Sequence, residues 1–214
     1  MITLTKKGLI ECDSSLIDQL RQEFTTKQCT VLPNLIEKEL LEKVIKHIDS
    51  APFYENHHTG TNDVIFATDL SMSTKNIAVH ELNFLLNNQQ LFRLVEHITS
   101  CSGIRSFGGR IYRNMPGENH RLDWHDDTTH PGRLIGISIN LGKEKFEGGT
   151  FRIRNKGSAV NLKTVDCTNP GDAHLFKISP HLEHSVTRVT GHIPRTACAG
   201  WFTTDTYSGP ASMI

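Results

Sequence analysis

The chain has 214 residues, of which 37% are hydrophobic and 21% are charged, and its 23 basic residues balance its 23 acidic ones. This length suits one sizeable core, so we expect a single domain over residues 1–214. A net charge of zero offers no field to attract nucleic acid or an anionic membrane, so we expect neither partner and favour a small-molecule or peptide substrate.

The first part of the chain, residues 1–104, is expected to be mainly helical. Apolar residues at helical spacing predict an amphipathic helix over about 14–26, an extended piece follows at 29–33, and residues 34–49 carry a single apolar stripe opposite a charged face. Residues 51–77 are polar and aperiodic, and a connection of that length suggests a functional loop or lid. Two further helical stretches are expected at about 78–87 and 89–100.

From about residue 107 the pattern changes to short strands separated by Gly, Pro and Asn. Several strands at this spacing predict a β-sandwich or jelly roll over residues 105–206. In the clearest strand, 133–141, the isoleucines fall on one face, whereas Ser138 and Asn140 fall on the other. We expect the apolar face to pack under helices and the polar face to line a cavity.

Cysteine usage indicates the compartment. The five cysteines are odd in number, widely spaced and without a CxxC pair, which fits free thiols in a reducing environment. No apolar run has the length of a signal peptide or a membrane span. We therefore expect a cytoplasmic protein, and the sequence leaves its oligomeric state open.

The stretch DWHDD holds a candidate metal-binding pair, His125-x-Asp127. The sequence contains three such His-x-Asp/Glu patterns, and about one is expected by chance. The pair at 47–49 falls on a predicted helix, where residues two apart point in different directions, and the pair at 181–183 lies in a Pro-led segment without strand periodicity. His125 and Asp127 lie in a segment that reads as extended chain, where residues two apart share a face and can reach one ion.

A third ligand is needed, and His184 is the candidate. It opens a strand-like stretch 57 positions after Asp127 (184 minus 127). Two histidines and one carboxylate are the ligand set of non-haem Fe(II) oxygenases. Any single histidine is more often a core or surface residue, but Arg195 follows on a predicted strand with small residues on the same face. Its planar guanidinium suits a terminal carboxylate.

The order of these motifs resembles the Fe(II)/2-oxoglutarate-dependent dioxygenases, in particular their prolyl-hydroxylase-like branch. The resemblance covers roughly residues 107–204 and rests on His125-x-Asp127, INLGKEKFEGGTFRI, NPGDAHLF, His184, and Arg195 ahead of AGWF; a weaker similarity extends to VLPNLIEKELLEKVIKHI. It implies an α+β, mainly β fold, with a double-stranded β-helix (jelly-roll, cupin-like) core behind N-terminal helices.

The resemblance also implies roles for individual residues. His125, Asp127 and His184 would ligate Fe(II), and Arg195 would pair with the distal carboxylate of the cosubstrate 2-oxoglutarate.

Two further cosubstrate-binding positions are implied. Tyr112 matches a tyrosine that often contacts the cosubstrate, although thirteen positions separate it from His125 (125 minus 112), more than the family pattern leads us to expect. Ordinary strand packing is the alternative role for Tyr112. Asn140 occupies the cavity-facing place where relatives present a polar group to the same carboxylate. His120, His130 and His174 lie near the site in sequence and are assigned no role.

The activity implied is that of a hydroxylase using Fe(II), 2-oxoglutarate and O2, with release of succinate and CO2. Asp127 occupies the position that a halide would need, which favours hydroxylation over halogenation, while desaturation and cyclisation stay open. The polar loops around the site suggest an amino acid, a peptide residue or a small polar natural-product intermediate as substrate. The alternative from another class is a non-catalytic jelly-roll module that binds metal or ligand and releases no succinate.

Overall fold

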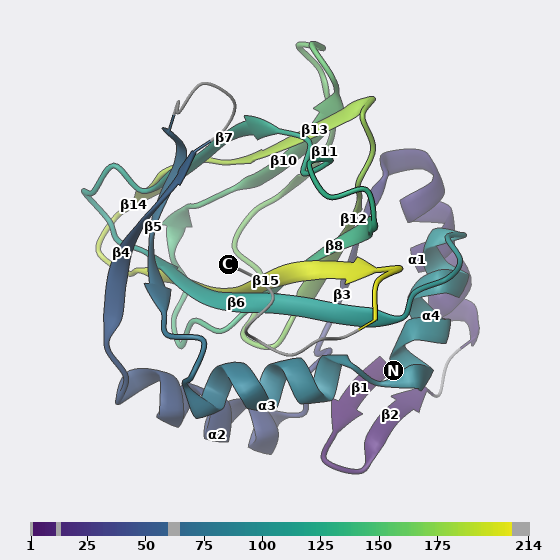
Figure 1. The fold of residues 1–214 in the computed structure, drawn as a ribbon, viewed down its shortest axis with the longest axis horizontal. Helices are drawn as coiled ribbons and strands as arrows, with labels where there is room; N and C mark the ends of the chain where they lie inside the picture. Colours follow the sequence, from purple (N-terminus) through teal and green to yellow (C-terminus); the bar gives the residue numbers. More distant parts are fainter. Residues whose placement is uncertain (1, 12–13, 60–64, 207–214) are drawn as a thin grey trace.

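The computed structural model describes residues 2–11, 14–59 and 65–206, and helices and strands alternate in the first half of the chain (Figure 1). The elements there are β1 (Ile2–Thr5), β2 (Gly8–Glu11), α1 (Ser14–Lys27), β3 (Cys29–Leu32), α2 (Lys38–Asp49), β4 (Phe53–Thr59), β5 (Ile65–Met72), α3 (Ile77–Leu86) and α4 (Gln89–Thr99). The helices match the predicted positions closely.

The second half is built from strands. These are β6 (Ser106–Asn114), β7 (Arg121–His125), β8 (Arg133–Asn140), β9 (Glu147–Gly148), β10 (Phe151–Asn155), β11 (Asn161–Val165), β12 (Ala173–Lys177), β13 (Leu182–Val186), β14 (Val189–Thr190) and β15 (Arg195–Thr203). The change from helical to strand periodicity near residue 107 is therefore confirmed.

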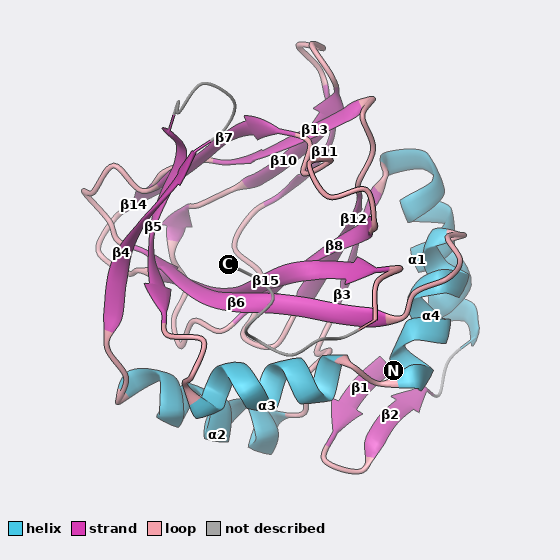
Figure 2. Ribbon diagram, viewed as in Figure 1, coloured by secondary structure: helices cyan, strands magenta, loops and turns pink. Residues whose placement is uncertain are grey.

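One large antiparallel sheet forms the body of the molecule. Its order is β11-β10-β13-β7-β5-β6-β15-β8-β12-β3, with β4 beside β5. The sheet curls on itself, so that β7, β13 and β10 lie across an interior from β6, β15 and β8 (Figures 1 and 2). This nearly closed jelly roll is the fold class predicted from the strand spacing.

The helices cover the outer face of the β6–β15–β8 wall. The apolar stripe of α2 is buried there, and Ile135, Ile137 and Ile139 of β8 join the same core, each 1% exposed or less. Ser138 and Asn140 point to the opposite side and line an internal cavity. The alternation read from the sequence of this strand is confirmed, and it separates the packing face from the face that carries chemistry.

Residues 51–77 do not form the long loop that we expected. They form the hairpin β4–β5, and β5 also pairs with β6 and β7, which makes the hairpin part of the main sheet. The hydrophobic signal is weak because β4 is exposed or half-buried along its length, so backbone pairing rather than apolar burial defines the strand. Residues 60–64 of the expected lid lie outside the described residues. The hairpin β1–β2 was also missed.

Two asparagines, Asn83 within α3 and Asn87 at its C-cap, replace a missing strand neighbour of β6. Beyond the end of β5, the backbone of β6 would present unpaired groups along Phe107–Gly109. Asn83 donates to the Gly109 carbonyl and accepts from its N–H, both at 3.2 Å, and Asn87 makes the same pair of bonds with Phe107 at 2.9 Å. The helix thereby satisfies a buried sheet edge through side-chain amides.

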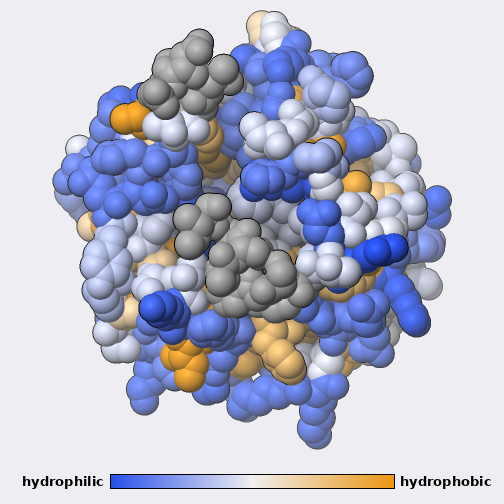
Figure 3. All heavy atoms as spheres, viewed as in Figure 1, coloured by the Kyte–Doolittle hydropathy of each residue, from blue (hydrophilic) through white to orange (hydrophobic). Residues whose placement is uncertain are grey.

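The buried apolar residues form two clusters, a large one that includes the helices and a smaller one that includes residues of β10, β12 and β13. The face shown in Figure 3 is mainly hydrophilic, with scattered apolar side chains. Within the described ranges, no helix combines the length and apolar character that crossing a membrane requires.

Replacing Asn83 with alanine should destabilise the fold. The change removes the partners of the buried Gly109 N–H and C=O, and each unsatisfied group costs about 1–3 kcal/mol, so we expect the free energy of unfolding to fall by about 2–4 kcal/mol. Denaturant unfolding measures this, with the exposed Asn161→Ala as control, expected to change by less than about 0.5 kcal/mol. Equal losses in the two variants would contradict the role given to Asn83.

Candidate active site

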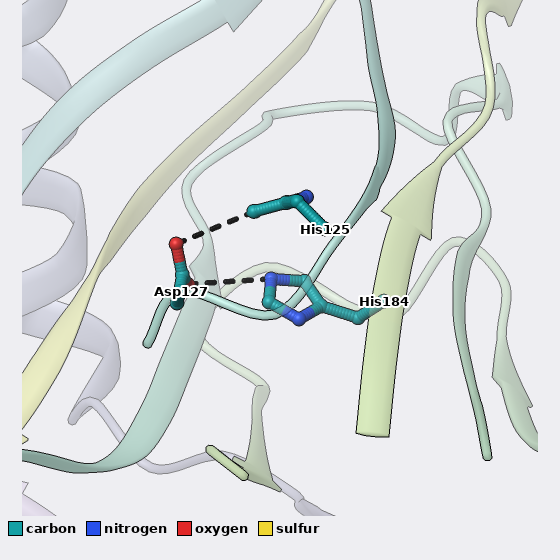
Figure 4. A group of neighbouring side chains, drawn as sticks. All are labelled: His125, Asp127 and His184. Carbon is teal, nitrogen blue, oxygen red and sulfur yellow. Dashed lines mark ion pairs between the residues drawn. The ribbon is translucent and has the colours of Figure 1, made fainter. Parts of the chain in front are cut away.

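Strand pairing brings the three predicted metal ligands together. β13 pairs with β7 so that His184 lies directly opposite His125, and their ring centroids are 4.1 Å apart. One ligand atom from each of His125, Asp127 and His184 lies within 4.8 Å of the other two. Figure 4 shows the two imidazoles and the carboxylate converging on one point. A single ion could therefore be held by all three.

Asp127 reaches this point by a route that the sequence did not indicate. The predicted extended chain ends at His125, the last residue of β7, and Asp127 follows with φ 59° in the left-handed region. The expectation of one continuous strand through Asp127 is therefore wrong. Aspartate is one of the few side-chain-bearing residues that tolerate this backbone, and the turn swings its carboxylate back toward the strand.

Hydrogen bonds fix the orientation of the first imidazole. His125 donates from Nδ1 to the Asp123 carbonyl at 2.8 Å. Its Nε2 is then the atom that faces Asp127, 3.4 Å from Oδ1, and the Nε2 of His184 is 3.4 Å from Oδ2. Backbone carbonyls commonly set the tautomer of metal-binding histidines in this way.

Two residues without a predicted role hold the carboxylate from the other side. Trp201 donates from Nε1 to Asp127 Oδ2 at 2.7 Å, and the Arg133 guanidinium lies 3.6 Å from the Trp201 ring centroid and 3.7 Å from Asp127 Oδ1. The alternation of the strand did not indicate this position of Arg133, because a β-bulge shifts the pairing of β8 with β15 between Phe202 and Thr203.

The electrostatics of the three side chains suit a divalent cation. Burial alone would raise the pKa of Asp127, but hydrogen bonds from His125 and His184 hold it well below its usual range. Burial lowers the pKa of His184 and favours its neutral form. An ionised carboxylate with two histidines is the donor set of non-haem Fe(II) sites. The residues present therefore fit ferrous iron.

The second predicted element, Arg195, lies buried in the wall of the internal cavity at 5% exposure. It donates to the hydroxyl of Tyr112, and to Ser138 Oγ at 3.2 Å. In the part of the chain that the structure describes, no carboxylate oxygen comes within 4.0 Å of it. A buried cation without an anion is costly unless a ligand supplies the charge, so the residues present fit an anionic group such as the distal carboxylate of 2-oxoglutarate.

The other two cosubstrate positions have different surroundings. Tyr112 is buried beside Arg195 and shares its hydrogen bond. Asn140 lines the same cavity, but its amide donates to the Thr168 carbonyl at 2.6 Å and accepts from the Gly142 N–H at 2.9 Å. Its side chain therefore braces the backbone around the cavity. The polar side chain of β8 that meets Arg195 is Ser138, which the sequence placed on the cavity face without a role.

A glycine leaves room for the guanidinium. A Cβ at Gly149 would lie 2.8 Å from Cδ of Arg195, and the φ of Gly149 is +58°. Gly149 thus makes space for the side chain of Arg195.

The rival histidine patterns lie away from the site. His47 on α2 is paired with Glu81 at 3.2 Å, His181 is exposed, and Glu183 pairs with Arg154. His120 accepts from the Met115 N–H at 2.9 Å, which explains its burial. None of them joins the triad.

A polar cluster on the hairpin stands beside the metal-binding group. Arg110 of β6 donates to both carboxylate oxygens of Asp69, at 2.8 and 2.6 Å, and His58 lies 3.2 Å from the same carboxylate. Phe66 links the cluster to the triad, because its ring centroid is 6.2 Å from that of His58 and 5.1 Å from that of His125. The hairpin thus forms one wall of the site.

Asp69 should give the protein a stability that depends on pH. Burial would raise its pKa, but hydrogen bonds from His58 and Arg110 keep the pKa below its ordinary value. The ionised group therefore stabilises the fold above the unfolded pKa of about 4, and the contribution is lost as pH falls below that value. We expect the free energy of unfolding of the wild type to exceed that of Asp69→Asn by about 2 kcal/mol or more at pH 7. This difference should narrow at pH 3. Unfolding at both pH values measures the difference, and a constant difference would contradict this explanation.

Comparisons with known proteins agree with this geometry. Residues 110–203 match the model of the 2OG-Fe(II) oxygenase superfamily. The fold is similar to that of an oxidoreductase of the 2OG-Fe(II) oxygenase family from Burkholderia pseudomallei, with a TM-score of 0.67 and 14% identity over 94% of this chain and 97% of that one. It is also similar to a Pseudomonas putida prolyl-4-hydroxylase, with a TM-score of 0.63 and 14% identity over 88% of this chain and 99% of that one.

A third similar structure is a Trichoplax adhaerens prolyl hydroxylase in complex with a peptide fragment of the hypoxia inducible factor oxygen degradation domain. Its TM-score is 0.61 at 15% identity, covering 88% of this chain and 89% of that one. No curated protein matches the sequence. At these identities the structures establish the fold, and the family match covers the strands that carry the triad and Arg195. The matched stretch, residues 110–203, is similar to the 2OG-Fe(II) oxygenase superfamily, whose cofactors are Fe(II), 2-oxoglutarate and O2.

Proposed function

We propose that the protein is an Fe(II)- and 2-oxoglutarate-dependent hydroxylase that acts on an unactivated C–H bond and releases succinate and CO2. The observation that carries the proposal is the convergence of His125, Asp127 and His184 within 4.8 Å, together with the unpaired buried cation of Arg195. One group suits a ferrous ion and the other suits a diacid. A module that only binds metal has no use for the second.

Each part of the site has a separate task. His125, Asp127 and His184 would hold the metal, with one ligand atom from each. Arg195, with Tyr112 beside it, anchors and orients the cosubstrate by its distal carboxylate. When bound, iron with 2-oxoglutarate and O2 supplies the oxidising power that no side chain possesses.

Trp201 and Arg133 keep the metal-binding carboxylate in place. The Trp201 N–H donates a hydrogen bond to one carboxylate oxygen of Asp127. Arg133 stacks on the indole ring and lies close to the other oxygen. Partners of this kind, outside the ligand set itself, orient ligands and raise metal affinity.

The surroundings of the site favour a polar substrate. The wall formed by His58, Asp69 and Arg110 is charged, and Arg133 adds a further cation near the triad. Such groups suit an amino acid, a peptide residue or a small polar natural-product intermediate. The likeness to prolyl hydroxylases, one of them in complex with a peptide, supports this class.

A cytoplasmic location also belongs to this proposal. The four cysteines in the described ranges are free thiols, and burial raises the pKa of Cys198 to about 12, which keeps it unreactive. A reducing compartment is consistent with this usage.

The first test of the function is metal binding. We expect the wild-type protein to bind one Fe(II) or Mn(II) per chain in anaerobic calorimetry, and His184→Ala to weaken binding by at least about 100-fold, since even partners outside the ligand set typically contribute 10–100-fold. His130→Ala, which removes an exposed histidine, should bind as wild type does. Equal affinity in all three proteins would exclude the triad as the metal site.

The second test separates the cosubstrate anchor from the metal. Arg195→Gln should bind Mn(II) normally but bind 2-oxoglutarate roughly 100-fold more weakly, because a buried charge pair is lost. It should also form little succinate with Fe(II) and O2. Arg188→Gln, which alters an exposed arginine, is the matched control. Succinate formation that survives Arg195→Gln and Asp127→Ala would defeat the proposed activity, and metal binding without any succinate would favour a non-catalytic module.

A further inference from the structure

His174 is a buried histidine that neither the candidate metal site nor the proposed cosubstrate contacts use. It is the second residue of β12, with 5% exposure, and its Nε2 has no hydrogen-bond partner. Only one other side-chain atom in the described ranges, Oδ1 of Asn114, shares this condition. Buried polar atoms are nearly always hydrogen-bonded, so a lone one requires an explanation.

The position of His174 supplies that explanation. β12 pairs with β8 so that His174 lies directly opposite Ser138, and paired residues of antiparallel strands project from the same face. Ser138 accepts a hydrogen bond from Arg195. His174, Ser138 and Arg195 line the same internal cavity. The imidazole of His174 therefore belongs to the wall that surrounds the guanidinium of Arg195.

Aromatic contacts place His174 on the side of the cavity toward the metal ligands. Its ring centroid lies 4.5 Å from that of Phe151 and 6.1 Å from that of Phe176. The same two phenylalanines lie 5.7 and 4.6 Å from His184. A ligand that extends from the triad to Arg195 would therefore pass beside the imidazole of His174.

The protonation of His174 suits a donor to an anion. Burial first, and then the positive charge of Arg195, lower the pKa of His174 to about 3. The ring is therefore neutral at physiological pH and carries one N–H. In the tautomer with the proton on Nε2, the ring offers that N–H to a carboxylate without adding a second buried charge beside Arg195.

We propose that His174 is a cosubstrate-binding residue, whose Nε2–H donates a hydrogen bond to the 2-oxoglutarate carboxylate that pairs with Arg195. The inference rests on the proposed function, because it requires 2-oxoglutarate to occupy this cavity. It adds a neutral donor to the cation and hydroxyls already described. The imidazole therefore helps to select a diacid over a 2-oxo acid that lacks the second carboxylate.

If His174 had only a structural role, replacing it would destabilise the fold. A role in ligand binding predicts no loss of stability. Leucine would fill most of the same space without burying an unpaired nitrogen, and apolar replacement of an unsatisfied polar group is neutral or stabilising. We expect His174→Leu to unfold at the same temperature as wild type or higher while losing affinity for the ligand. Such a trade of stability for function is common where a site is preorganised.

The test is anaerobic calorimetry of the Mn(II)-loaded protein with two ligands. These are 2-oxoglutarate and 2-oxopentanoate, which has the same chain length but ends in a methyl group. We expect His174→Leu to bind 2-oxoglutarate about tenfold or more weakly and 2-oxopentanoate within about twofold of wild type. His174→Gln, which restores an N–H donor, should recover part of the loss. His181→Leu, the same change at an exposed histidine, should bind both ligands as wild type does.

Three results would overturn the inference. Unchanged 2-oxoglutarate affinity in His174→Leu would show that His174 makes no hydrogen bond to this ligand. An equal loss of affinity for both ligands would indicate a general packing effect. His174→Phe keeps the aromatic contacts as a second variant without a donor, and failure of both variants to fold would establish a structural role. If wild-type protein binds Mn(II) but no 2-oxoglutarate, the proposed function fails as well, whereas loss of the His174 effect alone leaves that function intact.

Discussion

The antiparallel pairing of β13 with β7 is the constraint on which the site depends. It places His184 opposite His125 although 59 positions separate them in the chain (184 minus 125). A slip of one residue would turn one imidazole to the outside of the barrel and dismantle the site. The outward neighbours on β13 support the register, because Glu183 bonds to Arg154 and to the Gly157 N–H across the sheet. The metal-binding group is thus a property of the whole curled sheet.

Two of the charges around the site are compensated differently by the described part of the chain. Asp127 lies against the imidazoles of His125 and His184 and accepts a hydrogen bond from Trp201, whereas Arg195 donates to the hydroxyls of Tyr112 and Ser138. Without a ligand, neither charged group stabilises the fold much, because a buried charge must be fully compensated by its partners. Both make sense in a protein whose ligands are a cation and a diacid. The unpartnered nitrogen of His174 fits the same explanation, since each of these groups is completed by a ligand and not by the chain.

The sequence predicted the parts of this molecule in which periodicity and residue chemistry act locally. The apolar stripe of 34–49 and the alternation of 133–141 identified a helix and a two-faced strand, and the ordered motifs identified the three side chains that the fold brings together. The hairpin β4–β5 was missed because its strands bury little apolar surface and are defined by backbone pairing. Asp127 was expected in an extended strand, but its backbone is left-handed. Arg133 and Asn83 act through a bulge and a helix-to-strand contact, which depend on tertiary structure and leave no periodic signal.

The most direct test of the account is anomalous diffraction at the iron edge from crystals grown without oxygen with Fe(II) and 2-oxoglutarate. We expect one iron peak between Nε2 of His125, Nε2 of His184 and the carboxylate of Asp127, with the far end of the bound diacid against Arg195. An iron peak elsewhere, or a diacid whose distal carboxylate does not reach the guanidinium, would contradict it.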